Sequence, residues 1–465
     1  MISVEEILSY IGLIAILLVL VVLVVLVVLI AKFILRALLK WMIGDFTGKL
    51  FSDMYGENLF EIWIAGKRNS IQNLVEMELR AVDGKPLTRP VGPTLKFSPD
   101  FDNLMFVPSQ LAKLSLPASF KVNMQVTIGP NAKRPMTLSM PIMISGMGYG
   151  VALSEESKIA LAMASKVLDT AISSGEGPAL PEERENAGKY VLQICRWKWG
   201  ARTDEEISYA DMLEVQLGQG ADSGASNFDI TAFQGRASVL GGLSDGEAPI
   251  SFPTPPGIQC LEDWPGFMEI LRKRAKGIPI ALKLMASGNL EEELSFAVDL
   301  GFDVIVLDGA QGGSHGSSSI KQDDFGLPTL QALVRAVAFL KTSNVSLIIA
   351  GGFFTPGACL KALALGADAV YLGTVPLFAL THMQTKKVLP WEPPATLVFY
   401  NSKEKHKLNI EMAHKSVVNV FVSMVLEMEE AMISMGKKTL KELNAEDLIA
   451  LDSDTAELTN VRRSY

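Results

Sequence analysis

Eight short apolar runs recur between residues 141 and 374 of this 465-residue chain, and they constrain its fold more than any other feature. Most end in glycine or a polar residue, and helical patterns such as 154–168, 328–341 and 356–365 lie between several of them. Eight strands in β/α alternation predict an α/β fold, the (β/α)8 TIM barrel. A doubly wound open sheet is the alternative, because strand number does not establish closure. The predicted strands are 141–147, 170–175, 191–195, 213–218, 280–285, 304–309, 347–352 and 369–374.

The N-terminal segment has a different composition. Residues 11–31 carry no charge and consist almost wholly of Leu, Val and Ile, and about 20 such residues cross a hydrocarbon core. Acidic residues precede the run and no small-residue cleavage site follows it, which argues against a signal peptide. Three basic residues lie within 32–40, so the positive-inside rule places the rest of the chain in the cytoplasm. We expect residues 1–40 to be a single-pass membrane anchor; a buried helix of a soluble domain is the alternative, which the absence of any polar face disfavours.

The remaining chain divides into three regions. Prolines and turn-forming residues dominate "RPVGPTLKFSPDFDNLMFVPSQL", which predicts an irregular pre-barrel segment, 41–135, packed on the barrel of 136–383. The tail, 384–465, contains a predicted helix that ends at Gly436. Its four methionines recur at helical spacing and predict ordinary core packing; they are Met424, Met428, Met432 and Met435.

Charge and cysteine usage exclude two kinds of site. The net charge is −9, which does not suit a nucleic-acid surface with its clustered cations. Cys195, Cys260 and Cys359 lie far apart and lack a CxxC spacing. We therefore expect neither a disulfide framework nor a structural metal site.

The loops after the last three predicted strands are rich in glycine. In a TIM barrel the active site lies at the carboxyl ends of the strands, and strands seven and eight often hold a phosphate there. Backbone N–H groups and helix N-termini favour an anion. The alternative is that these glycines only form tight turns. The glycines and the threonine concerned are Gly312, Gly313, Gly351, Gly352, Gly373 and Thr374.

Lys283 is the second indication of a ligand-binding site. It lies within "IPIALKLM", in a strand that a barrel covers on both faces, and a buried ammonium is costly unless an anion pairs with it. Reduced flavin carries negative charge at one edge of its ring, which a lysine at a strand end suits. The alternative is a lysine whose side chain reaches solvent.

Residues 135–383 resemble the FMN-binding synthase domain of the glutamate synthase family. No single motif is specific, but seven occur in the family's order, and "LMFVPSQLAKL" (104–114), "IGPNAKRPM" and the tail "LKELNAEDLIALD" resemble the short archaeal-type members. The ordered motifs are "PIMISGMGYGVALSEES", "SSGEGP", "VLQICRWKWGA", "LEVQLGQG", "ALKLM", "GAQGGSHGSSSIK" and "IIAGGFFTPGACLKALALGADAVYLGT".

The resemblance implies FMN as the cofactor, lying across the barrel mouth. Gly146, Met147, Gln193 and Lys283 would surround the ring, and the six positions of the last three loops would hold the phosphate. Glu176 in "SSGEGP" matches an acidic residue near the family's substrate. The residues implied in catalysis are therefore Lys283, Glu176 and Gln193.

This chain departs from the family in two places. The family's cysteine-rich iron–sulfur segment after strand eight has no counterpart in "VPLFALTHMQTKKVLPWEPP", so no thiolate-bound cluster is expected there. Gln216 and Asp222 stand where the family's substrate loop has lysines, although a 2-oxoglutarate site needs cations for two carboxylates. Arg196 and Lys198 offer some of that charge. His315 stands where the family has a small residue; it is either a proton donor near the flavin or a loop histidine bonded to backbone or solvent.

These features predict a membrane-anchored FMN-dependent oxidoreductase. Reduced FMN would act on a C=N or C=C substrate, with reductive amination of 2-oxoglutarate as the family's reaction. No GxGxxG opens a second nucleotide-binding unit, so a donor within the membrane is favoured over a soluble nicotinamide. The partners expected are thus a small-molecule substrate, the bilayer through residues 11–31 and a membrane electron donor, without nucleic acid. The alternative function is a non-catalytic flavin- or phosphate-binding module at the membrane.

Overall fold

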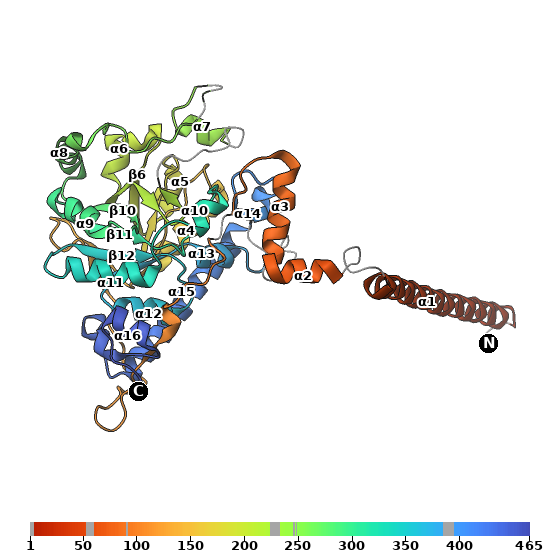
Figure 1. Cartoon of the computed structure of the whole chain (residues 1–465). Coiled ribbons are helices and arrows are strands. Elements are labelled where there is room, and N and C mark those ends of the chain that lie inside the picture. The colour runs from red at the N-terminus through yellow and green to blue at the C-terminus, as the bar shows by residue number, and fades with distance from the viewer. Residues whose placement is uncertain are drawn as a thin grey trace. The chain divides into compact units, whose positions relative to one another are not determined.

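The computed structural model describes residues 4–52, 60–89, 92–223, 233–244, 247, 249–384 and 395–465. The chain forms two compact units, Met1–Leu87 and Thr88–Tyr465 (Figure 1). Each unit is described by itself below.

The N-terminal unit is helical. Helix α1 (Val4–Ser52) is much longer than the apolar run of residues 11–31, and within it Ala15–Gly48 is long and apolar enough to cross a membrane. Every side chain described in that stretch is exposed. Uniform exposure of an apolar helix is the opposite of what a buried core helix shows.

Two further helices follow where an irregular segment was predicted. They are α2 (Phe60–Asn69) and α3 (Ile71–Asp83). The Ser70 hydroxyl accepts a hydrogen bond from the Asn73 backbone N–H at 3.1 Å, which caps α3. An ion pair between Arg80 and Glu76, 3.1 Å apart and one turn distant, stabilises the helix surface. The prediction of an irregular segment over 41–135 is therefore wrong for residues 41–52 and 60–83.

The second unit is built on a closed barrel of eight parallel strands, in the spatial order β10-β11-β12-β13-β4-β5-β6-β7. Lys283 on β10 pairs with Val306 on β11 and with Gln216 on β7, so no strand edge is open. The predicted TIM barrel is confirmed, and each predicted strand overlaps one strand of the barrel. Their bounds are β4 (Ile142–Ile144), β5 (Ala171–Ser173), β6 (Lys189–Ile194), β7 (Met212–Gln216), β10 (Ile280–Met285), β11 (Val304–Asp308), β12 (Ser346–Ala350) and β13 (Ala369–Leu372).

Helices surround the strands, as Figure 1 shows for α8, α9 and α11 around β6, β10, β11 and β12. Three match the predicted helices within a residue at each end: α4 (Glu155–Val167), α11 (Thr329–Leu340) and α12 (Pro356–Ala364). The other barrel helices are α5 (Pro181–Asn186), α6 (Asp204–Ser208), α7 (Arg236–Leu240), α8 (Trp264–Ala275), α9 (Leu290–Asp299), α10 (Ser319–Asp323) and α13 (Thr374–Leu380).

A hairpin of β2 (Val126–Ile128) and β3 (Met136–Leu138) closes the amino-terminal end of the barrel. Its buried Ile128, Met136 and Leu138 form one apolar cluster with interior side chains of the strands. The Gly129 N–H donates to the Ser346 hydroxyl at 3.1 Å, beside the start of β12. With this end filled, the opposite end is left for a ligand.

Residues 88–135 of the pre-barrel segment and the tail belong to the same unit as the barrel. Strand β1 (Leu104–Phe106) pairs antiparallel with β14 (Leu448–Ala450) of the tail. Helix α15 (Ile410–Ser434) packs against α4, α12 and α13, and all four methionines of the predicted stripe are buried, which confirms core packing. Two short helices complete the tail, α14 (Ala395–Val398) and α16 (Ser453–Thr459). The short antiparallel strands β8 (Gly218–Gln219) and β9 (Asp222–Ser223) follow β7 at the barrel mouth.

Candidate active site

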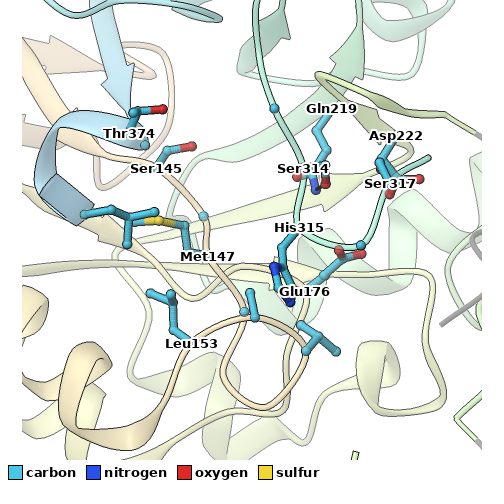
Figure 2. A pocket seen from close by; sticks show the side chains of 18 of the residues that line it. Ser145, Met147, Leu153, Glu176, Gln219, Asp222, Ser314, His315, Ser317 and Thr374 are labelled. Carbon is cyan, nitrogen blue, oxygen red and sulfur yellow. Dashed lines mark hydrogen bonds between the residues drawn. The ribbon is translucent and has the colours of Figure 1, made fainter. Parts of the chain in front are cut away.

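A cavity lies at the carboxyl ends of the barrel strands, where loops from several βα units meet (Figure 2). Residues 145–148 after β4, Glu176 after β5 and Trp197 after β6 form one part of its wall. Lys283 on β10, Asp308 at the end of β11 and residues 313–317 form another. Gly373 and Thr374 after β13 complete the lining, together with residues of the β8–β9 loop and Phe399 of the tail.

Most of the predicted site residues lie around this one cavity, but some do not. Seven line it: Gly146, Met147, Glu176, Lys283, Gly313, Gly373 and Thr374. Gln193, Gly312, Gly351 and Gly352 lie outside its lining. Gln193 is directly behind it, because a Cβ added at Gly146 would lie 3.1 Å from the Gln193 amide nitrogen.

Two of the predicted phosphate-loop glycines have a conformational role in this structure. Gly351 has φ of +116°, and a Cβ there would lie 2.7 Å from the Thr329 hydroxyl and 2.9 Å from the Gly309 carbonyl. Gly312 packs against Gly220, whose added Cβ would come within 2.6 Å of the Gly312 Cα. Close approach of three backbone segments therefore explains these glycines without a ligand.

Lys283 is buried and positively charged. Its Nζ lies 3.7 Å from Asp308 Oδ2 and 5.7 Å from the centre of the Tyr371 ring. Burial by itself would lower the pKa of Lys283, but nearby carboxylates outweigh burial and raise it. In order of effect these are Asp308, Glu214 and Glu176. The lysine side chain does not reach solvent, so that alternative is wrong and the charged form persists inside the barrel mouth.

Gln193 positions a buried acidic side chain, Glu214, near Lys283. Its Nε2 donates to Glu214 Oε1 at 2.7 Å, and the Ser173 hydroxyl lies 3.3 Å from the same oxygen. Burial raises the pKa of Glu214, while Lys283 and the amide of Gln193 lower it. Gln193 therefore holds a buried acid in place below the cavity.

Glu176 is a titratable group of the cavity wall. Burial raises its pKa to about 7, and the negative charge of Asp222 acts in the same direction. Arg196, the indole of Trp197 and Lys283 lower it. Trp197 Nε1 donates to Glu176 Oε2 at 3.1 Å. A carboxyl group with a pKa near neutrality can accept or release a proton at physiological pH.

A buried lysine, Lys158 of α4, ties two of the lining loops together. Its ammonium donates to the carbonyls of Met147 at 2.8 Å, Ser174 at 3.1 Å and Ser173 at 3.4 Å. It also pairs with Glu183 at 2.7 Å. The loops after β4 and β5 are thus fixed from behind by charge-assisted hydrogen bonds.

The two positions that carry lysines in the family belong to a buried polar cluster here. Arg196 donates to Asp222 Oδ2 at 2.8 Å and to Gln216 Oε1 at 3.4 Å. Lys321 Nζ lies 3.6 Å from the other Asp222 oxygen. Lys198, the second cation considered for a substrate carboxylate, is instead paired with Glu247 at 2.8 Å and is half-exposed.

His315 lines the cavity with its ring against Phe399, the centroids 4.4 Å apart. Burial lowers its pKa to about 4. Its Nδ1 has no hydrogen-bond partner within the described chain. A neutral imidazole at pH 7 is a poor proton donor, which does not support that role for His315.

The end of the cavity at β13 suits a phosphate. A Cβ added at Gly373 would meet only the Ser145 Cβ, at 3.9 Å, so the backbone there faces open space. Thr374 begins α13, whose first N–H groups have no partner within the helix. Figure 2 shows the hydroxyls of Ser145 and Thr374 close to each other at this end. With Lys283 deeper in the cavity, these residues fit the phosphate and the ring edge of FMN.

Sequence reasoning missed several polar residues of the lining, namely Ser145, Gln219, Asp308, Ser314 and Ser317. Asp308 was visible as the charged end of an apolar run, which is the signal that could have found it. Among the residues that the structure describes, no three His, Cys, Asp or Glu side chains are grouped as a metal site requires. The cysteine-free segment after β13 lies partly in residues 385–394, outside the described residues.

Comparison with known proteins places this site in a family. Residues 96–438 match the family described as "Conserved region in glutamate synthase". The glutamate synthase large subunit-like protein of Rhizobium meliloti is 29% identical over 83% of this chain and 92% of its own length. The archaeal glutamate synthase [NADPH] of Archaeoglobus fulgidus is 29% identical over 69% of this chain and 64% of its own length, so the match spans less than two thirds of that relative.

Solved structures agree with the fold. A soluble mutant of the membrane-associated (S)-mandelate dehydrogenase from Pseudomonas putida superposes with a TM-score of 0.50. It is 16% identical, and the superposition covers 75% of this chain and 88% of that one. At this identity the similarity shows the barrel fold alone.

Proposed function

This chain belongs to the glutamate synthase family, and from that premise we propose that it is a membrane-anchored oxidoreductase acting on a carbon–nitrogen or carbon–carbon double bond, or on its reduced counterpart. Membership of the family makes it an FMN-dependent oxidoreductase. When bound, FMN supplies the two-electron chemistry, and the protein supplies binding, orientation and charge.

The observation that carries the proposal is the buried, charged Lys283 beside an open cavity whose far end suits a phosphate. A cation held inside a low-dielectric barrel mouth stabilises negative charge on a ligand more strongly than an exposed cation does. Gly146 and Met147 bring backbone to the same wall, and Gln193 supports Gly146 from behind. These residues bind and orient the ring; Gly373 and Thr374 anchor the phosphate.

Glu176 is proposed as the group that moves the substrate's proton. It lines the cavity beside Trp197, and its pKa of about 7 lets either protonation state be populated. Such a carboxyl group is a competent general acid or base near neutral pH.

We do not assign 2-oxoglutarate as the substrate. A dicarboxylate needs cations for both carboxylates. Gln216 is uncharged, and Asp222, which lies beside both Arg196 and Lys321, offsets one of their two positive charges.

The anchor in this proposal is α1, with the barrel on the cytoplasmic side and electrons supplied from within the membrane. Support comes from the apolar stretch Ala15–Gly48 and from the basic residues within 32–40.

The test uses the full-length protein purified in detergent. The visible absorbance band of oxidised flavin should accompany it at one FMN per chain, bleach with an electron donor and recover with an acceptor. Absence of bound flavin would refute the proposal. Flavin that never turns over with any donor and acceptor would instead identify the non-catalytic module.

A further inference from the structure

Two tryptophans of the loop after β6 direct their indole N–H groups at one residue, Glu176. Trp197 Nε1 donates to the side-chain oxygen Oε2 of Glu176 at 3.1 Å. Trp199 Nε1 donates to the backbone carbonyl of the same residue at 2.8 Å, and the Cys195 Sγ lies 3.4 Å from that carbonyl oxygen. An indole has one N–H and only donates. The side chain and the backbone of Glu176 are therefore each held by a separate indole.

Stacked rings fix the orientation of both indoles. The rings of Trp197 and Trp199 are parallel within 1° with their centroids 5.3 Å apart, and Phe233 stacks on Trp199 at 5.0 Å. Only 2% of Trp197 and 8% of Trp199 is exposed. A Cβ added at Gly241 would lie 2.9 Å from the Trp199 ring, so the end of α7 also packs on the stack. Offset stacking and burial together set the direction of the two N–H groups.

The backbone on both sides of Glu176 is held by buried cations. The Lys158 ammonium donates to the Ser174 carbonyl at 3.1 Å. The Arg202 guanidinium donates to the Gly177 carbonyl at 2.9 Å. Hydrogen bonds from charged donors are stronger than those from neutral donors. The segment that carries Glu176 is therefore rigid, and the protonation of its side chain depends on the groups around it.

The groups around the Glu176 carboxyl act on its pKa in opposite directions. Burial has the largest effect and raises the pKa to about 7, and the charge of Asp222 raises it further. Arg196, the Trp197 hydrogen bond and Lys283 lower it. A donor to a carboxylate favours the charged form. Asp308 and His315 line the same cavity, and Lys321 lies beside Asp222.

We infer that Trp197 and Trp199 are positioning residues for Glu176: the Trp197 N–H holds the side chain in its ionised form, and the Trp199 N–H fixes the backbone that carries it. The inference rests on the proposed function, because Glu176 is the proton-moving group of that proposal. A neutral indole that only donates cannot take the proton itself. It therefore favours the base form of Glu176 without competing for the substrate's proton.

The test follows the protonation of Glu176 by infrared spectroscopy of the full-length protein in detergent. The carboxyl C=O band that wild type shows and Glu176→Gln lacks belongs to Glu176, and it should titrate with a midpoint of about 7. Trp197→Phe keeps an aromatic ring in the stack and removes the N–H. We expect it to raise the midpoint by about one to two pH units, because a hydrogen bond to a charged group is lost. An unchanged midpoint, or a wild-type protein without a Glu176 band that titrates in the neutral range, would overturn the inference.

Two control variants separate this effect from a general loosening of the fold. Trp199→Phe removes only the hydrogen bond to the backbone, so it should lower the free energy of unfolding and leave the midpoint unchanged. Trp264→Phe alters a buried indole of α8, which packs on Phe267 and Phe302, and should also leave the midpoint unchanged. A shift in either control as large as that in Trp197→Phe would show that the Trp197 N–H has no particular role.

A second variant covers the case in which Trp197→Phe does not fold. A benzothiophene analogue of tryptophan at position 197 keeps the shape of the ring and lacks the N–H. The same rise in the midpoint is expected, and its absence would overturn the inference.

The two proposals fail separately, because the infrared titration needs neither substrate nor turnover. A shifted midpoint in a protein that never turns over retains the role of Trp197 and overturns the proposed function. Turnover with an unshifted midpoint overturns the inference and leaves the proposed function.

Discussion

Replacing Lys283 by methionine tests the centre of the site most directly. Methionine keeps much of the side-chain volume and removes the charge. The Nζ–Oδ2 distance to Asp308 is 3.7 Å, and two unit charges at this distance attract by about 4 kcal/mol at the effective dielectric constant of about 20 that suits protein sites. Removing one partner of a buried pair costs about 3–5 kcal/mol, because the other charge stays buried and uncompensated.

We therefore expect Lys283→Met to lower the free energy of unfolding by about 3–5 kcal/mol in a denaturant titration of the detergent-solubilised protein. Adding Asp308→Asn should recover most of that loss, because it removes the stranded charge. The matched control is Lys198→Met, whose ion pair with Glu247 is exposed and should contribute nothing measurable.

The same variant should lower the midpoint potential of the bound flavin, because the reduced, more negative form loses a neighbouring cation. Spectroelectrochemical titration of wild type and variant measures this change. An unchanged potential at full flavin content, together with unchanged stability, would refute the assignment of Lys283 as a buried cation at the ring.

Three further outcomes are expected. Gly373→Ala should fold normally but retain less FMN on gel filtration, because its Cβ would enter open space at the phosphate end. Gly177→Ala, in contrast, should fail to fold, because its Cβ would lie 2.2 Å from the Tyr149 carbonyl oxygen. The rate of the step that needs a base should rise as pH increases through about 7, the raised pKa of Glu176, and a pH profile that keeps this inflection in Glu176→Gln would contradict the assignment. Deleting residues 1–40 should release the enzyme from membranes and abolish flavin reduction by a membrane fraction; reduction by NAD(P)H at the full-length rate, with nothing added by membranes, would show that the donor is soluble.

Local pattern was sufficient to locate the eight strands, whereas their closure into a barrel is seen only in the structure. Each strand is buried on both faces, and such a strand is recognisable as a run of consecutive, mainly apolar residues, as in "VIVLD" and "SLIIA". The apolar stretch near the N-terminus is equally local, because a span depends only on length and hydrophobicity. Helices α2 and α3 were missed because the proline-rich sequence after them dominated the interpretation of the whole of 41–135, although the cap at Ser70 was a readable signal.

Pairing across the barrel was not readable from the chain. Arg196 and Asp222 are 26 positions apart and meet only because β6 and β7 are neighbours. The packing of Gly312 against Gly220 likewise depends on two loops that converge at the barrel mouth, so a glycine-rich motif alone could not distinguish a phosphate loop from a close backbone contact.

The sequence by itself thus located the eight strands and the apolar segment, which follow from residue type and local periodicity, and its ordered motifs indicated the family. Only the tertiary structure decided which charges remain available to a ligand. It placed Arg196 beside Asp222, raised the pKa of Glu176 by burial and left an Asp308 oxygen without a donor among the residues that the structure describes. The physical reason is that the electrostatic environment of a buried group depends on its neighbours in space, which elements far apart in the chain supply.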